Sequence, residues 1–252
     1  MLQGKVVLVT GAGSGIGRAA CVMFAKNGAS VLVADIDEPA AEASVAMIRS
    51  AGGTAEARRC DVSDEGSVSD LVAYAVDRFG RLDGAVNNAG IEMRGKPVFE
   101  LTGQDWRSVI DVDLTGVFYC LKHEILAMRE TGGGSIVNTA SSSGVRATMN
   151  SADYTSAKHG VIGLTKAAAI DCGPLGIRVN AVCPGLTLTS MTRDRLMSDP
   201  GFTVALEGIR QRHIIGRFGE TDEIANAMMW LLSDLSSFST GAAMLVDGGF
   251  SI

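Results

Sequence analysis

Residues 5–17 constrain the fold more than any other part of this 252-residue chain. The apolar run at residues 6–9 is rich in β-branched side chains and too short for a helix, so it predicts a buried strand. Glycines then occupy positions 11, 13, 15 and 17, where the missing side chains let the backbone turn sharply and approach a ligand. Apolar residues at helical spacing follow, namely Ile16, Ala20, Met23 and Phe24.

A strand, a glycine turn and a helix in this order can hold a dinucleotide. The free N–H groups and the positive dipole at the start of the helix suit a pyrophosphate. The usual G-x-G-x-x-G spacing is absent, because Ile16 and Arg18 stand where its third glycine would fall. Taken alone, the segment is therefore also compatible with a tight turn that binds nothing.

The rest of the chain alternates short apolar runs with amphipathic helical ones. Further strands are predicted over residues 30–34, 55–60, 82–86, 135–138, 178–182 and 243–246, and further helices over 39–51, 64–79, 102–130, 153–171 and 221–233. This alternation predicts an α/β fold, a single-domain Rossmann-like doubly wound parallel sheet of about seven strands with helices on both faces. Residues 186–217 have poor periodicity and are predicted to form a mobile flap over a pocket.

Charge and composition limit the classes of partner. The net charge is -6 and Arg58 with Arg59 is the only basic doublet, which argues against nucleic acid. No apolar stretch reaches 18 residues and no targeting signal precedes the first strand, so we expect a cytoplasmic protein without a membrane span.

Cysteines and histidines give no sign of a metal site. The five cysteines are scattered without a C-x-x-C pair, so they are predicted to be reduced and mostly buried. The three histidines lack a ligand spacing such as H-E-x-x-H, and we predict no bound metal.

Ligands of such sheets bind beyond the carboxyl ends of the strands. Asp35 ends the second predicted strand, eighteen positions after Gly17, where an acidic side chain would accept hydrogen bonds from a ribose and repel a 2′-phosphate. Ser14 in the glycine turn supplies no cation for such a phosphate. Both observations favour NAD over NADP, although Asp35 could also be an ordinary cap for a helix that begins near Glu38.

Tyr154 and Lys158 are four residues apart on a predicted helix and therefore share one face. A free tyrosine titrates near ~10, and a neighbouring ammonium favours its phenolate. Tyr154 could then take the proton of an alcohol while hydride leaves for a nicotinamide, and Ser141, at a strand end, could hold the same oxygen. Alone, Y-x-x-x-K is a weak signal that also occurs by chance on half-solvated helix faces, but here it follows the glycine turn, Asp35 and Ser141.

Over nearly its full length the chain resembles the short-chain dehydrogenase/reductase family. The matching motifs are residues 10–17, Asp61-Val62, residues 87–90, Ser141, Tyr154-Thr155-Ser156-Ala157-Lys158, Asn180, Pro184-Gly185 and Asp247-Gly248-Gly249. The resemblance implies that Asp61 and Val62 contact the adenine, that Asn88 braces the ribose side, and that Lys158 binds the nicotinamide ribose. It also implies that residues 184–189 flank the nicotinamide, and that the protein is a homotetramer in which residues 106–128 and 154–171 form one interface and the C-terminus forms another.

These arguments assign catalysis to Ser141, Tyr154 and Lys158. The predicted cofactor contacts are Gly11, Ser14, Gly15, Ile16, Gly17, Asp35, Ile36, Asp61, Val62, Asn88, Ala89, Gly90, Tyr154, Lys158, Pro184, Gly185, Leu186, Thr187 and Thr189. One position departs from the family pattern, because Asp113 stands where most members carry an asparagine that holds a water in a proton relay. Asp113 could accept from that water and raise the pKa of Lys158, or it could merely cap or kink its helix.

The sequence predicts an NAD-dependent oxidoreductase that interconverts a small or medium secondary alcohol and its ketone. Cyclic alcohols and diols are favoured, since residues 135–141 and 215–218 are similar to those of bacterial cyclic-alcohol and diol dehydrogenases. Candidate substrate contacts are residues 92–94 and 145–149, Leu186, Met191, Phe202 and Ile214. The alternatives are an NADPH-dependent ketoreductase such as a 3-oxoacyl reductase, and a dinucleotide-sensing protein without turnover.

Overall fold

The computed structural model describes residues 1–189 and 200–252. A single parallel sheet of seven strands runs through it in the order β3-β2-β1-β4-β5-β6-β9. Its strands are β1 (Val6–Thr10), β2 (Ser30–Asp35), β3 (Thr54–Arg59), β4 (Gly84–Asn87), β5 (Gly134–Thr139), β6 (Ile177–Pro184) and β9 (Ala243–Val246). The predicted doubly wound α/β fold is confirmed, and β1 and β4 adjoin at the point where the strand order reverses.

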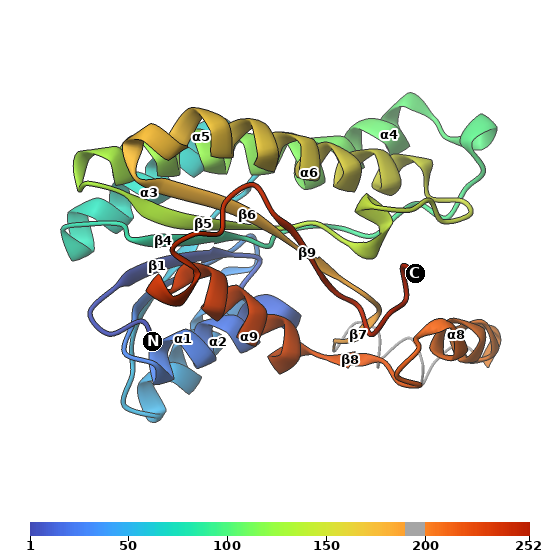
Figure 1. Cartoon of the computed structure of the whole chain (residues 1–252), viewed down its shortest axis with the longest axis horizontal. Coiled ribbons are helices and arrows are strands. Elements are labelled where there is room, and N and C mark those ends of the chain that lie inside the picture. The colour runs from blue at the N-terminus through green and yellow to red at the C-terminus, as the bar shows by residue number, and fades with distance from the viewer. Residues whose placement is uncertain (190–199) are drawn as a thin grey trace.

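Helices cover both faces of the sheet (Figure 1). One face carries α3 (Glu65–Phe79), α5 (Gly116–Glu130) and α6 (Ala152–Cys172), with α4 (Gly103–Ile110) beyond them. The other carries α1 (Gly15–Lys26), α2 (Glu38–Ser50) and α9 (Thr221–Leu232). Among the described residues, no helix combines the length and the apolar character needed to cross a membrane.

The sheet separates two apolar cores, one beneath each helical layer. The strand predictions hold because runs such as residues 6–9 and 31–34 are buried throughout. All five cysteines are free and buried, as predicted. Two apolar residues of α5 do not lie inside: Phe118 and Leu126 are 46% and 42% exposed.

Two predicted segments differ from the structure. The helix expected over 102–130 is interrupted by a π-helical turn, η2 (Asp111–Thr115), between α4 and α5. The segment 186–217, predicted to be irregular, contains the helix α8 (Pro200–Arg212) and the strand β7 (Thr187–Leu188), which pairs with β8 (Gly219–Glu220). Its residues 190–199 lie outside the described part of the chain, and the role of a flap stays a prediction.

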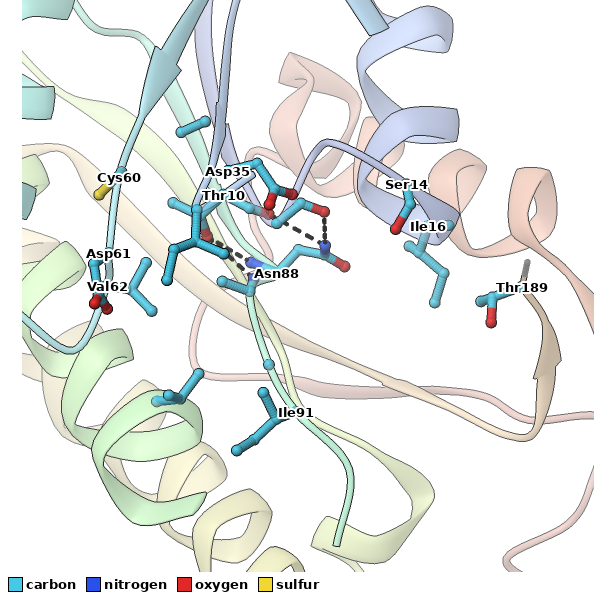
Figure 2. Close-up of a pocket in the computed structure, with 17 residues that line it drawn as sticks. Thr10, Ser14, Ile16, Asp35, Cys60, Asp61, Val62, Asn88, Ile91 and Thr189 are labelled. Atoms are coloured by element: carbon cyan, nitrogen blue, oxygen red, sulfur yellow. Dashed lines mark hydrogen bonds between the residues drawn. The ribbon is translucent and has the colours of Figure 1, made fainter. Parts of the chain in front are cut away.

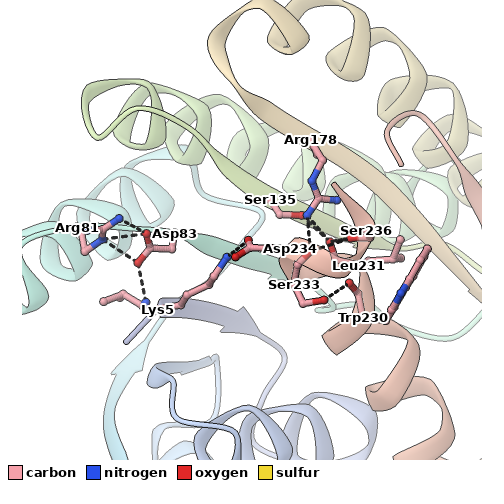
Figure 3. Close-up of polar contacts among 11 residues, drawn as sticks. Lys5, Arg81, Asp83, Ser135, Arg178, Trp230, Leu231, Ser233, Asp234 and Ser236 are labelled. Carbon is pink, nitrogen blue, oxygen red and sulfur yellow. Dashed lines mark hydrogen bonds and ion pairs between the residues drawn. The ribbon is translucent and has the colours of Figure 1, made fainter. Parts of the chain in front are cut away.

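Polar contacts hold the amino ends of the strands in place, on the side of the sheet opposite the ligand side (Figure 3). Asp83 accepts the Val6 N–H at 2.8 Å, which ties the start of β1 to the segment before β4. The carbonyl oxygen of Leu231, near the end of α9, accepts from the Arg178 Nη2 and Ser135 Oγ atoms, both at 2.8 Å. These bonds satisfy polar groups at the end of a helix and at the ends of strands, whereas ligands of such sheets bind at the opposite, carboxyl ends of the strands.

Candidate active site

The glycine turn between β1 and α1 packs closely against the backbone at the end of β4. Gly11 has a φ of +61°, and a Cβ there would lie 2.7 Å from the Ala89 Cα atom. A Cβ on Gly17 would collide with the Gly11 carbonyl oxygen. Only glycine fits these two positions, so the turn can lie flat against the end of β4.

Side chains from β1 and β4 fix the turn from behind. Thr10 Oγ1 accepts the N–H groups of Asn88 and Ala89 at 3.1 and 3.2 Å. The Asn88 amide donates back to the carbonyl oxygens of Thr10 and Gly11 at 3.2 and 3.0 Å. Because the turn's carbonyls are held inward, the first N–H groups of α1 remain for a ligand. Ser14, the N-cap residue, makes no capping bond in the described structure.

Asp35 at the end of β2 lies over the same turn. Its Oδ2 atom accepts the Gly13 N–H at 2.8 Å, and its Oδ1 atom accepts the Asp37 N–H at 3.0 Å. The cap of α2 is Asp37, whose side chain accepts the Ala40 N–H. The alternative role of Asp35 as the cap of this helix is therefore wrong.

A cavity of about 370 Å³ opens above these groups (Figure 2). Its walls come from the carboxyl ends of β1, β2 and β4, from the segment after β3, and from the start of α1. The lining residues are Thr10, Gly11, Ser14, Gly15, Ile16, Ala34, Asp35, Ile36, Cys60, Asp61, Val62, Asn88, Ala89, Gly90, Ile91, Val112 and Thr189. Most predicted cofactor residues thus meet around one space of a size that suits an organic ligand.

Tyr154 and Lys158 lie one turn apart on α6, as their spacing requires. The Lys158 Nζ atom is 5.3 Å from the centre of the Tyr154 ring. Lys158 is only 4% exposed, and its ammonium also donates to the Thr139 carbonyl oxygen at 3.2 Å. The tyrosine is half-buried, and a buried cation lies beside its ring.

Asp113 in the π-helical turn connects this pair to the cavity. Its Oδ2 atom is 3.1 Å from Lys158 Nζ, and its Oδ1 atom accepts the Ile91 N–H at 2.8 Å. A Cβ on Gly90 would lie 3.1 Å from Asp113 Oδ2 and 3.5 Å from Lys158 Nζ. Since Gly90 and Ile91 line the cavity, the ion pair lies directly behind its wall.

The charge of Asp113 opposes the effect of burial on the pKa of Lys158. Burial favours the neutral amine and lowers the pKa of Lys158, but the carboxylate of Asp113 and the phenol of Tyr154 raise it more. The net pKa of Lys158 is above its ordinary value, so the side chain is a cation at neutral pH. The contacts of Asp113 with α6 and with Ile91 give it more than the capping or kinking role that the sequence left open.

Ser141 and residues 184–187 lie at the ends of β5 and β6. Ser141 Oγ accepts the Ser143 N–H at 3.0 Å at the start of the short helix η3 (Ser142–Gly144). Gly185 and Leu186 line a second cavity of about 290 Å³ with His213. Gly17, Tyr154, Lys158 and Pro184 through Thr187 are outside the lining of the first cavity, so their predicted contacts with a cofactor stay predictions.

Comparison with known proteins assigns the family. A family profile described as enoyl-(acyl carrier protein) reductase matches residues 11–251. The chain belongs to the short-chain dehydrogenase/reductase family.

Individual relatives of the family cover the whole chain. A 2,5-dichloro-2,5-cyclohexadiene-1,4-diol dehydrogenase of Sphingobium indicum is 48% identical over 250 residues, which are 99% of this chain and 98% of that protein. A cyclohexanol dehydrogenase of an Acinetobacter species is 42% identical, and the matched residues are 98% of this chain and 94% of that protein. The crystal structure of an NAD⁺-bound xylitol dehydrogenase has a TM-score of 0.93 at 35% identity, covering 98% of this chain and 99% of that chain. The protein is an oxidoreductase acting on CH–OH groups of secondary alcohols and on the corresponding ketones.

Sequence reasoning missed several residues around the site. Thr10, Ile91 and Val112 line the cavity, yet none has a side chain that signals cofactor chemistry. Thr10 could have been found from its position, directly after a buried strand and before the first glycine. Met191 and the side chain of Phe202, both predicted substrate contacts, lie outside the described part of the chain.

Proposed function

We propose that the protein oxidises cyclic secondary alcohols and diols to ketones with NAD⁺, and catalyses the reverse reduction with NADH. One observation carries the proposal: the ion pair of Lys158 with Asp113 lies behind Gly90 and Ile91 in the wall of the cavity above the glycine turn. This arrangement supports a reaction in which Tyr154, above that ion pair, meets the substrate at the edge of the cavity. The cyclic diol and cyclohexanol dehydrogenases among its relatives support the substrate class.

In this proposal the side chains of α6 move the proton. Tyr154 accepts the hydroxyl proton of the alcohol, and it returns a proton to the carbonyl oxygen in the reverse reaction. The ammonium of Lys158 stabilises the negative charge on the phenol oxygen, and Asp113 keeps that ammonium charged. Ser141 donates a hydrogen bond to the reacting oxygen. A bound nicotinamide supplies the acceptor for the hydride.

The cavity residues fit a nicotinamide dinucleotide. The uncapped start of α1 suits the pyrophosphate, and Gly11 and Gly15 of the turn line the cavity. Asp61 and Val62 would contact the adenine, Asn88 would lie on the ribose side, and residues 184–189 would flank the nicotinamide. The carboxylate of Asp35 supports NAD rather than NADP, because it would face a 2′-phosphate with a like charge.

We expect the charge of Asp35 to control this discrimination between NAD and NADP. Asp35→Asn keeps an oxygen for the Gly13 N–H but removes the negative charge. Like charges in contact cost several kcal/mol, so we expect the ratio of kcat/KM for NAD⁺ to that for NADP⁺ to fall by about 10- to 100-fold. Asp37→Asn is the control and should keep the wild-type ratio. A wild-type protein that uses both cofactors equally would contradict the assignment.

The second prediction concerns the reaction itself. With NAD⁺ and a panel of alcohols, absorbance of NADH should grow for cyclohexanol and cyclic diols, and much less for linear primary alcohols. The panel should be assayed in both directions with matched ketones. If neither cyclic alcohols nor their ketones react while the cofactor binds, the proposed substrate class is wrong.

The proposed assembly is a homotetramer. Phe118, Leu126 and Ile170 on α5 and α6 are 46%, 42% and 78% exposed in the single chain, and this apolar surface supports the interface that the family resemblance implies. Sedimentation velocity measures the mass of the assembly. A cytoplasmic location stays a prediction.

A further inference from the structure

The segment between β4 and α4 is held at two backbone N–H groups by two aspartates that are fully buried. Asp113 accepts from Ile91, and Asp153 Oδ2 accepts from the Arg94 N–H at 3.1 Å. Residues 91–97 form no helix or strand, so these two bonds fix a stretch that has no regular backbone pairing. Glu92 and Met93 lie between the two anchors.

Asp153 is an unusual anchor because it is a carboxylate with 0% exposure and backbone partners. Its second oxygen, Oδ1, accepts the Tyr154 N–H at 2.8 Å. Within the described ranges no basic side chain forms an ion pair with it, and the Arg94 guanidinium instead donates to Ser108 Oγ at 2.9 Å. A buried carboxylate is costly unless it is hydrogen-bonded, and here two N–H groups and the positive end of α6 stabilise it.

The same carboxylate thus joins two parts of the site. One oxygen holds the backbone of the proposed base, and the other holds the loop that continues from the cavity wall at Gly90 and Ile91. The distance from Ile91 to Arg94 is only three residues, so the positions of residues 92 and 93 relative to Tyr154 depend on both anchors. Without the anchor at Asp153, the loop would keep its link to Asp113 but would no longer be fixed to the first turn of α6.

We propose that Asp153 is a positioning residue that holds Glu92 and Met93 as a wall of the alcohol site beside Tyr154. This inference rests on the proposed function and adds to it the element that sets affinity for the alcohol. Asp153 contacts the backbone of Tyr154 rather than the reacting atoms, so it should influence substrate binding more than the chemical step.

Asp153→Asn tests the proposal with little change in volume. The amide oxygen can accept only one of the two N–H groups, and the amide nitrogen cannot accept the other. Loss of one charge-assisted hydrogen bond should raise KM for a cyclic alcohol about tenfold, while kcat changes less than about threefold and the Kd for NADH stays constant. Asp83→Asn is the matched control, since Asp83 also accepts a backbone N–H but lies at the opposite edge of the sheet (Figure 3).

Hydrogen exchange of the full chain with NADH gives a readout that needs no substrate. Exchange at residues 92–96 should accelerate about tenfold in Asp153→Asn and stay unchanged in Asp83→Asn. Should the asparagine variant not fold, Asp153→Ser, whose hydroxyl can accept the Tyr154 N–H, replaces it in both measurements. Unchanged exchange in this loop, or KM and the NADH Kd rising together, would overturn the proposal.

A double-mutant cycle with Met93→Ala separates this inference from the proposed function. If Asp153 acts by placing Met93, the increases in KM from the two substitutions should be less than additive. Additive effects would mean that Asp153 acts elsewhere. If the wild-type protein oxidises no alcohol but the loop exchanges faster in Asp153→Asn, the proposed function fails while the anchoring stands.

Discussion

Tyr154→Phe should abolish nearly all turnover and leave cofactor binding intact. The substitution removes the only group of this side chain that can accept or donate a proton, while the ring still packs beside Lys158. General acid–base catalysis is worth about 10² to 10⁴ in rate, and we expect kcat to fall by about 10³-fold. Absorbance of NADH measures kcat, and quenching of protein fluorescence measures the Kd for NADH, which should change less than about twofold.

Tyr74→Phe is the matched control for the loss of a phenol. Tyr74 is a residue of α3 that stacks with Arg58 at 4.8 Å near the outer strand β3, far along the chain from α6. It should keep the wild-type kcat. A Tyr154→Phe enzyme with more than about a tenth of the wild-type kcat would show that another group transfers the proton.

Local patterns were enough to predict most of the fold. Residues 6–9 and 31–34 are buried on both faces of the sheet, so their β-branched runs identify strands without knowledge of their neighbours. The exposure of Phe118 and Leu126 could not be predicted, because apolar spacing shows that a helix has an apolar side but does not show whether this chain covers it. The π-helical turn was not predicted, because it adds only one residue to a helical pattern that is otherwise continuous.

Buried polar groups far apart in the sequence were the least predictable. Glu124 is fully buried against Asn87 at 3.0 Å, and burial raises its pKa to about 8. Asn87 in turn donates to Asn138 on the neighbouring strand, which links β4 to β5. Nothing in the spacing of these residues shows that they meet, because β4, α5 and β5 come together only in the folded chain.

The sequence suggested that Asp113 could raise the pKa of Lys158, but it could not show the contact of Asp113 with Ile91. In the structure one carboxylate connects α6, which carries the proposed base, with the cavity wall, and this makes Asp113→Ala the second substitution with a large expected effect. Asp113→Ala leaves the Lys158 ammonium without its counter-charge, although Lys158 is only 4% exposed. Breaking a buried pair at one partner costs about 3–5 kcal/mol, so the free energy of unfolding in urea at pH 7 should fall by about that amount.

Measurement at pH 7 is appropriate because of the direction in which the pKa of Lys158 shifts. Because the folded pKa of Lys158 lies above its ordinary value of 10.5, the stabilisation is complete below that pH and is lost only as the pH rises through the folded pKa. Asp113→Asn should cost less stability than alanine, since its oxygen can still accept the Ile91 N–H. An alanine variant as stable as wild type at pH 7 would mean that the pair contributes nothing.

Asp113→Asn also separates the charge of Asp113 from its role as a loop anchor. Burial lowers the pKa of Lys158 and the carboxylate opposes it, so removing the charge should let the ammonium lose its proton at a lower pH. Tyr154 needs that cation, and the alkaline limb of the plot of log kcat against pH should therefore move to lower pH. A wild-type profile in the asparagine variant would show that the charge of Asp113 does not control the ionisation of Lys158.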